Sequence, residues 1–115
     1  MLEDIRYKIS KKVSKKRDME QYEITMDQLL QKQLNGAEIV DVRSSQEYEE
    51  GHLDGAINIP YYEISKDLEK ILSDKNKEIV VYCSAGIRGK KAYKSLTKLK
   101  YKNVYNLYGG LENWI

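Results

Sequence analysis

Residues 78–89 read EIVVYCSAGIRG, and they divide into an apolar strand, a loop of small residues and the start of a helix-forming run. The strand ends at Cys83, and Gly86 lies within the loop. A strand that leads through a tight loop into a helix directs several backbone N–H groups, and the positive end of the helix dipole, toward one point. Donors of this kind stabilise a thiolate, so the loop favours the reactive form of Cys83.

Other interpretations of the same loop are possible. A single cysteine at the end of a strand is often a small buried hydrophobe. Gly86 fits an ordinary turn, and Arg88 fits a solvated charge. What favours a reactive site is the combination of a thiol, small residues, a glycine and a permanent cation within one short loop.

The composition indicates one compact globular domain. The chain has 115 residues, of which 41% are hydrophobic and 33% charged, which is typical of a folded soluble protein and not of a disordered one. A single cysteine excludes an internal disulfide framework and fits a reducing compartment. No apolar run reaches membrane-spanning length and no signal peptide is visible, so the expected location is cytoplasmic.

The charge is unevenly distributed. Residues 1–17 hold seven basic residues against two acidic ones, a net charge of +5, and place Leu2, Ile5, Ile9 and Val13 at helical spacing. We predict a basic amphipathic helical arm that packs against its own domain or a neighbour. Contact with a membrane surface is the alternative that we do not favour. The rest of the chain carries 13 basic and 16 acidic groups and shows no nucleic-acid groove.

Beyond the arm, short strands alternate with helices. This alternation predicts a parallel sheet covered on both faces, with the site beyond the carboxyl ends of its strands. Cys83, Asp41 and the end of the 56–59 strand would share that edge. The predicted strands are 22–25, 38–42, 56–59, 78–82 and 103–107; the predicted helical segments are 26–34, a short turn at 44–51, 61–72, 90–100 and a terminal helix after Gly110.

Three sets of residues then resemble a known family. Together they are similar to the rhodanese (thiosulfate sulfurtransferase) homology domain: the first set contains Asp41-Val42-Arg43, Glu47-Tyr48, Gly51-His52-Leu53, Gly55-Ala56 and Asn58-Ile59-Pro60, the second is the Cys83–Arg88 loop, and the third is Gly109-Gly110-Leu111 with Trp114. The resemblance covers roughly residues 22–115. We therefore assign residues 18–115 to a rhodanese-like domain and place the 1–17 arm outside it.

The resemblance implies a three-layer α/β/α rhodanese-like fold with a five-stranded parallel sheet. It also implies that Cys83 carries sulfane sulfur as a persulfide, from thiosulfate or a related donor to a thiol, a protein or cyanide, by covalent catalysis in two half-reactions. Backbone N–H groups of the loop would stabilise the anionic sulfur, and Arg88 would bind the donor or order the loop. The loop residues are Ser84, Ala85, Gly86, Ile87, Arg88 and Gly89.

Four further residues of the family signature are expected to support the site structurally: Asp41, Arg43, Glu47 and His52. His52 follows a glycine at a turn and fits a hydrogen-bonded strut better than a base. As the sole histidine it excludes a multi-histidine metal site, so we expect neither a metal nor another cofactor.

Two rival functions remain. Some phosphatases and arsenate reductases resemble rhodanese domains but use a Cys-x5-Arg loop, whereas four residues separate Cys83 from Arg88 here. The shorter loop makes a smaller anion cradle, which favours sulfur over a tetrahedral phosphate. The second rival is a non-catalytic regulatory binding module; such rhodanese-like domains usually lack the cysteine that this chain retains.

Overall fold

The computed structural model describes residues 19–115, so the predicted arm at 1–17 lies outside the described residues. Strands and helices alternate along the chain. The strands are β1 (Glu23–Ile24), β2 (Glu38–Asp41), β3 (Ile57–Asn58), β4 (Glu78–Tyr82) and β5 (Asn103–Leu107); the helices are α2 (Met26–Leu34), α3 (Ser45–Glu50), α4 (Ile64–Ile71), α5 (Ile87–Lys98) and the 3₁₀ turn η2 (Leu111–Asn113).

The five strands form one sheet in the order β1-β5-β4-β2-β3, and every pairing is parallel. This confirms the predicted five-stranded parallel sheet. The register pairs Asp41 with Tyr82 and Val81 with Asn106. The carboxyl ends of β2, β4 and β5 therefore lie at one edge, where Cys83 follows directly after β4.

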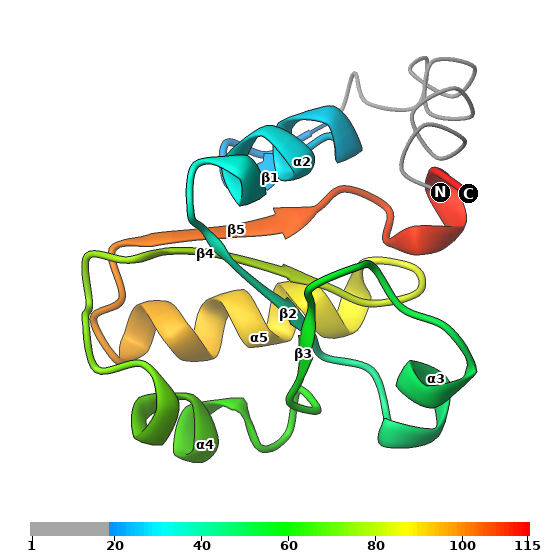
Figure 1. Cartoon of the computed structure of the whole chain (residues 1–115). Coiled ribbons are helices and arrows are strands. Elements are labelled where there is room, and N and C mark those ends of the chain that lie inside the picture. The colour runs from blue at the N-terminus through cyan, green and yellow to red at the C-terminus, as the bar shows by residue number, and fades with distance from the viewer. Residues whose placement is uncertain (1–18) are drawn as a thin grey trace.

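Alternate residues of the central strands face two separate cores, because successive side chains of a strand point to opposite faces. Ile39, Val80 and Tyr82 pack with α2 and the C-terminal Trp114. Val40, Val81 and Cys83 pack with α4 and α5 on the other face. Figure 1 shows the resulting three layers, with α2 on one side of the sheet and α4 and α5 on the other. The predicted α/β/α architecture is confirmed.

Local capping explains where two helices begin. The Thr25 hydroxyl accepts a hydrogen bond from the Gln28 amide at 3.2 Å, and the Gln28 Oε1 accepts one from the Thr25 amide at 2.8 Å, so α2 begins with a capping box. Ser44 and Glu47 form the same arrangement at the start of α3. In α3 this places the Glu47 carboxylate at the helix start, on the side that faces the edge with Cys83.

Some predicted details are wrong. The segment predicted as a helix over 61–72 is helical only over α4, and Ile71, the last residue of α4, is 62% exposed. The helix ends at Ile71, and Leu72 continues in an extended conformation and packs against the core in its place. Helix α5 begins at Ile87 instead of the predicted Lys90, and the C-terminal helix is a single 3₁₀ turn.

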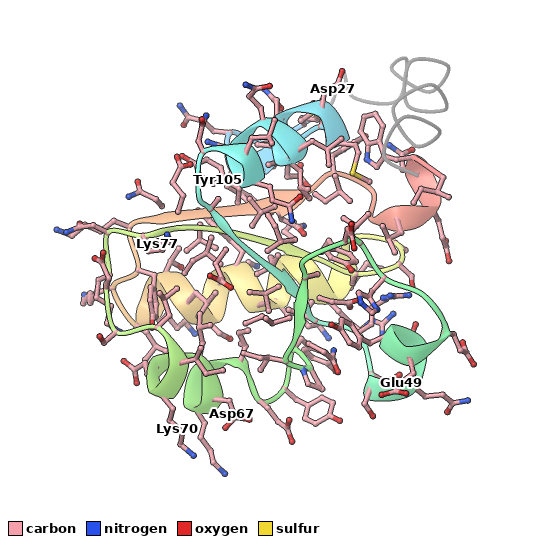
Figure 2. All side chains as sticks on the ribbon, viewed as in Figure 1. Asp27, Glu49, Asp67, Lys70, Lys77 and Tyr105 are labelled. Carbon is pink, nitrogen blue, oxygen red and sulfur yellow. The ribbon has the colours of Figure 1, made fainter. Side chains whose placement is uncertain are left out.

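Apart from the buried Asp41 and Arg43, most charged side chains of the described residues lie at the surface of the molecule. Figure 2 shows Glu49 on α3 and Lys70 on α4 directed away from the sheet. Among residues 19–115, no helix is both long enough and apolar enough to cross a bilayer.

Candidate active site

Cys83 lies at the carboxyl end of β4 with only 1% of its surface exposed. Its Sγ accepts hydrogen bonds from the backbone N–H groups of Gly86 at 3.0 Å and of Gly89 at 3.3 Å. Two N–H donors aimed at one sulfur can stabilise negative charge on it, because hydrogen bonds to a charged acceptor are stronger than those to a neutral one. The geometry thus suits a nucleophilic thiolate and, after reaction, an anionic sulfur adduct.

The loop turns directly into α5, which explains the early start of that helix. Gly86 is the N-cap residue, with a φ of +99° that favours glycine, and its carbonyl accepts the Lys90 amide at 3.0 Å. Arg88 and Gly89 therefore belong to the first helical turn, where backbone N–H groups have no partner within the helix. Ile87 points outward and is 68% exposed.

The C-terminal segment supports the other side of the loop. The Leu111 amide donates to the Cys83 carbonyl at 2.8 Å, and the Glu112 amide donates to the Ser84 carbonyl at 2.9 Å. Gly110 makes this approach possible, since a Cβ there would lie 2.4 Å from the Ser84 carbonyl oxygen. The adjacent glycines of the family signature thus have a physical role that sequence reasoning did not identify.

Arg88 pairs with Glu47 across the gap between α5 and α3. The two guanidinium–carboxylate contacts measure 2.7 and 3.0 Å, and the Ser84 hydroxyl donates to the same carboxylate at 3.2 Å. The Arg88 hydrogen bonds, with help from Ser44, lower the pKa of Glu47 to about 2. Because the Arg88 guanidinium already donates to the Glu47 carboxylate, the geometry favours its predicted role in ordering the loop over direct binding of the sulfur donor.

Asp41 and Arg43 form a second ion pair, placed behind the first. Asp41 is fully buried, and its carboxylate accepts from the Arg43 amide and from the guanidinium, the shortest contact being 2.7 Å. Arg43 also donates to the Gly51 carbonyl at 2.6 Å. The hydrogen bond that the Arg43 guanidinium donates to Asp41 is the main cause that raises the pKa of Arg43. This pair joins the end of β2 to the end of α3, as a supporting pair would.

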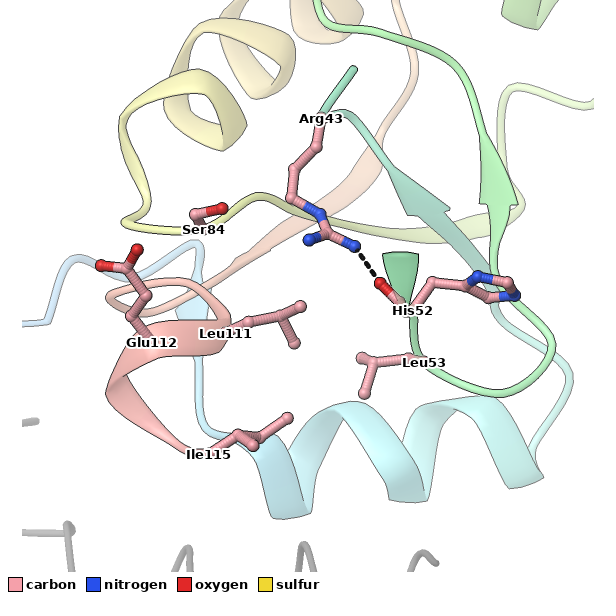
Figure 3. Close-up of a pocket in the computed structure, with 8 residues that line it drawn as sticks. Arg43, His52, Leu53, Ser84, Leu111, Glu112 and Ile115 are labelled. Carbon is pink, nitrogen blue, oxygen red and sulfur yellow. Dashed lines mark hydrogen bonds between the residues drawn. The ribbon is translucent and has the colours of Figure 1, made fainter. Parts of the chain in front are cut away.

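His52 lies apart from the loop. Its ring is exposed, stacks on Tyr48 with centroids 3.7 Å apart, and makes a 2.8 Å contact with the Tyr48 carbonyl. Figure 3 shows the ring directed away from Ser84. Within residues 19–115, no hydrogen bond joins His52 to the loop, so the geometry fits a strut of the α3 turn.

Two clefts flank the loop. One, of about 440 Å³, is drawn in Figure 3, and it is lined by Arg43, Gly51, His52, Leu53, Ser84, Leu111, Glu112 and Ile115. The other, of about 530 Å³, is lined by Glu23, Ala85, Gly86, Ile87, Lys90, Tyr108, Gly109 and Asn113. Cys83 lines neither cleft, so a reactant that enters from either side meets the loop before it meets the sulfur.

The fold and the site together define a class: α/β proteins with a parallel sheet and a hydrogen-bonded cysteine at the carboxyl end of the central strand. Residues 25–115 match the family described as the rhodanese-like domain. The chain therefore belongs to the rhodanese-like domain family.

Known relatives place sulfur transfer within this family. The chain is 38% identical over 74 residues to thiosulfate sulfurtransferase PspE of Escherichia coli, covering 64% of this chain and 70% of that protein. The human single-domain sulfurtransferase TSTD1 superimposes with a TM-score of 0.72 at 26% identity, covering 83% of this chain and 96% of that one.

The family also includes much longer proteins. The tRNA uridine(34) hydroxylase of Sodalis glossinidius is 43% identical over 76 residues, which represent 63% of this chain. This chain spans 22% of the length of that hydroxylase and between 20% and 26% of several similar relatives.

Proposed function

We propose that this protein is a sulfurtransferase that carries sulfane sulfur on Cys83. The observation that carries the proposal is the pair of N–H donors, from Gly86 and Gly89, on a buried Sγ within a Cys-x4-Arg loop. Members of the same family named as sulfurtransferases support it.

The reaction consists of two displacements. The Cys83 thiolate attacks the outer sulfur of thiosulfate, a new S–S bond forms, and the old S–S bond breaks as sulfite leaves with the electron pair. An external thiolate or cyanide then attacks the terminal sulfur of the Cys83 persulfide. The acceptor takes that sulfur, and the cysteine thiolate is restored.

The chain contributes a site prepared for anionic sulfur. Burial at Cys83 excludes water, and the two N–H donors are already aimed at the reacting atom before the donor arrives. Glu47 neutralises Arg88, so the charge on the loop is balanced before the substrate anion enters.

An acceptor from outside the chain is required. Cys83 is the only cysteine, so its persulfide has no internal thiol with which to form a disulfide. We propose a small sulfur donor and a small thiol or protein acceptor, in the reducing cytoplasm.

Intact-mass measurement tests the proposal. The reduced protein is treated separately with thiosulfate, mercaptopyruvate and glutathione persulfide and then desalted; we expect a species heavier by one sulfur atom. Cyanide or a small thiol should return the original mass, and Cys83→Ser should never gain the sulfur. If no donor yields the adduct, the sulfur-carrier function is wrong and a binding module takes its place. Hydrolysis of an aryl phosphate by the unmodified protein would instead indicate a phosphatase.

A further inference from the structure

Asn106 is a fully buried polar residue on β5, on the face of the sheet that α5 covers. It shares that face with Val104, which packs in the α5 core, and its register partner on β4 is Val81. A fully buried amide on a central part of a sheet is costly unless its polar atoms are used. Val81 precedes Cys83 by two residues, so Asn106 lies beside the end of β4, directly beneath the loop.

The Asn106 amide contacts both residues that supply N–H groups to the sulfur. Its Nδ2 donates to the Gly86 carbonyl at 3.2 Å. Its Oδ1 lies against Gly89, where a Cβ would be only 2.1 Å away, and the three atoms nearest to that position all belong to Asn106. Within the described part of the chain, Oδ1 accepts no hydrogen bond.

This arrangement is poorly explained by stability alone. The Gly86 carbonyl already accepts the Lys90 amide at 3.0 Å, so it would stay satisfied without Asn106. The unpaired Oδ1 costs free energy, because a buried acceptor without a partner loses its bonds to water. An apolar side chain of the same shape would remove that cost.

We infer that Asn106 is a positioning residue for sulfur chemistry at Cys83. Its Nδ2 restrains Gly86, and its amide fills the space beside Gly89, so the two N–H donors are held on the sulfur together. This inference rests on the proposed function, because the position of the two donors matters for turnover only if Cys83 transfers sulfur. The restraint itself acts on the hydrogen bonds to the Cys83 sulfur, so it can be tested without turnover. It also explains why residue 89 has no side chain.

Two variants separate positioning from stability. Asn106→Leu keeps the branched shape without polar atoms, and Asn106→Ala removes the donor without adding bulk. Asn103→Leu is the matched control, since Asn103 lies on the same strand and its Nδ2 donates to a backbone carbonyl, that of Asn76, at 2.8 Å. The Asn103 bond is exposed and lies at the end of β5 away from Cys83.

The first measurement is the rate of Cys83 alkylation by iodoacetamide against pH, with urea unfolding of each variant alongside. We expect both Asn106 variants to react more slowly near neutral pH, because a poorly held pair of donors stabilises the reacting sulfur less. Asn106→Leu should keep the unfolding midpoint close to that of the wild type. Asn103→Leu should keep the wild-type pH profile even if its stability falls.

The second measurement is the rate of persulfide formation from thiosulfate, which should fall roughly ten- to a hundredfold in Asn106→Leu, as misplacement of a reacting centre by about 1 Å does. Gly89→Ala should be strongly impaired in the wild-type background and much less so beside Asn106→Ala, where its methyl group has room. Wild-type alkylation profiles in both Asn106 variants, or additive effects of the two substitutions, would overturn the inference. If the wild type forms no persulfide, the proposed function is wrong, and the alkylation profiles still test Asn106.

Discussion

The Glu47–Arg88 pair offers a direct test of how the loop is held. We consider Glu47→Gln, which removes the charge but keeps an oxygen that can accept the Ser44 amide and preserve the helix cap. The substitution leaves Arg88 without its carboxylate, and each partner side chain is about one-third exposed, at 33% and 31%. We expect the variant to be folded, less stable at neutral pH and slower in persulfide formation.

The magnitude follows from the pKa of Glu47, which falls from 4.5 to about 2 chiefly through the Arg88 hydrogen bonds. At about 1.4 kcal/mol for each tenfold change in proton affinity, the full effect is roughly 3 kcal/mol. Solvent screening at a pair this exposed reduces it to about 1 kcal/mol. Because the folded-state pKa is lowered, this stabilisation is complete above about pH 4.5 and disappears as the pH falls through about 2.

Urea unfolding of wild type and Glu47→Gln at pH 7, 5, 3 and 2 measures this difference. The wild type should be more stable by about 1 kcal/mol at pH 7 and pH 5, less so at pH 3, and equal to the variant near pH 2. Glu49→Gln is the control, since Glu49 lies exposed on the same helix and makes no ion pair within residues 19–115. A difference that is absent at pH 7, or that stays constant down to pH 2, would refute the reasoning.

Three further changes test other parts of the site. Gly110→Ala places a Cβ 2.4 Å from the Ser84 carbonyl oxygen at a φ of +69°. The free energy of unfolding should therefore fall by about 2 kcal/mol. A fall of less than about 0.5 kcal/mol would show that the segment can move aside. Inserting one glycine between Ile87 and Arg88 should reduce sulfur transfer from thiosulfate to cyanide at least tenfold; unchanged transfer would mean that loop length does not select the reaction. Deleting residues 1–17 should leave cooperative unfolding and sulfur transfer intact, and loss of cooperative unfolding would place the arm in the core.

Much of the fold can be predicted from local sequence. The apolar run at 79–82 predicts β4, Thr25 predicts where α2 begins, and the candidate caps Ser44 and Ser45 predict the start of α3, where the structure uses Ser44. These features depend on residues near in the chain, so periodicity and capping chemistry reveal them. The parallel sheet follows because strands that alternate with helices at short spacing must cross over in the same direction.

Helix ends were harder to predict. The Lys90 start for α5 was wrong because Gly86 accepts the Lys90 amide and closes a turn that composition alone does not reveal. The helix predicted over 61–72 was too long at both ends, because α4 begins at Ile64 and ends at Ile71, after which Leu72 is extended. At both places, a single hydrogen bond or chain reversal outweighs a weak periodic pattern.

The sequence by itself determined the candidate nucleophile, the loop length and the edge of the sheet on which both lie, since these follow from residue type and order. Tertiary structure alone decided the partners of that loop. Glu47 reaches Arg88 from 41 positions away, the Leu111 amide supports the Cys83 carbonyl, and Asn106 contacts Gly86 across 20 positions. Such pairs arise because parallel strands bring their carboxyl ends to one edge whatever their separation along the chain, and no local pattern records which side chains then meet.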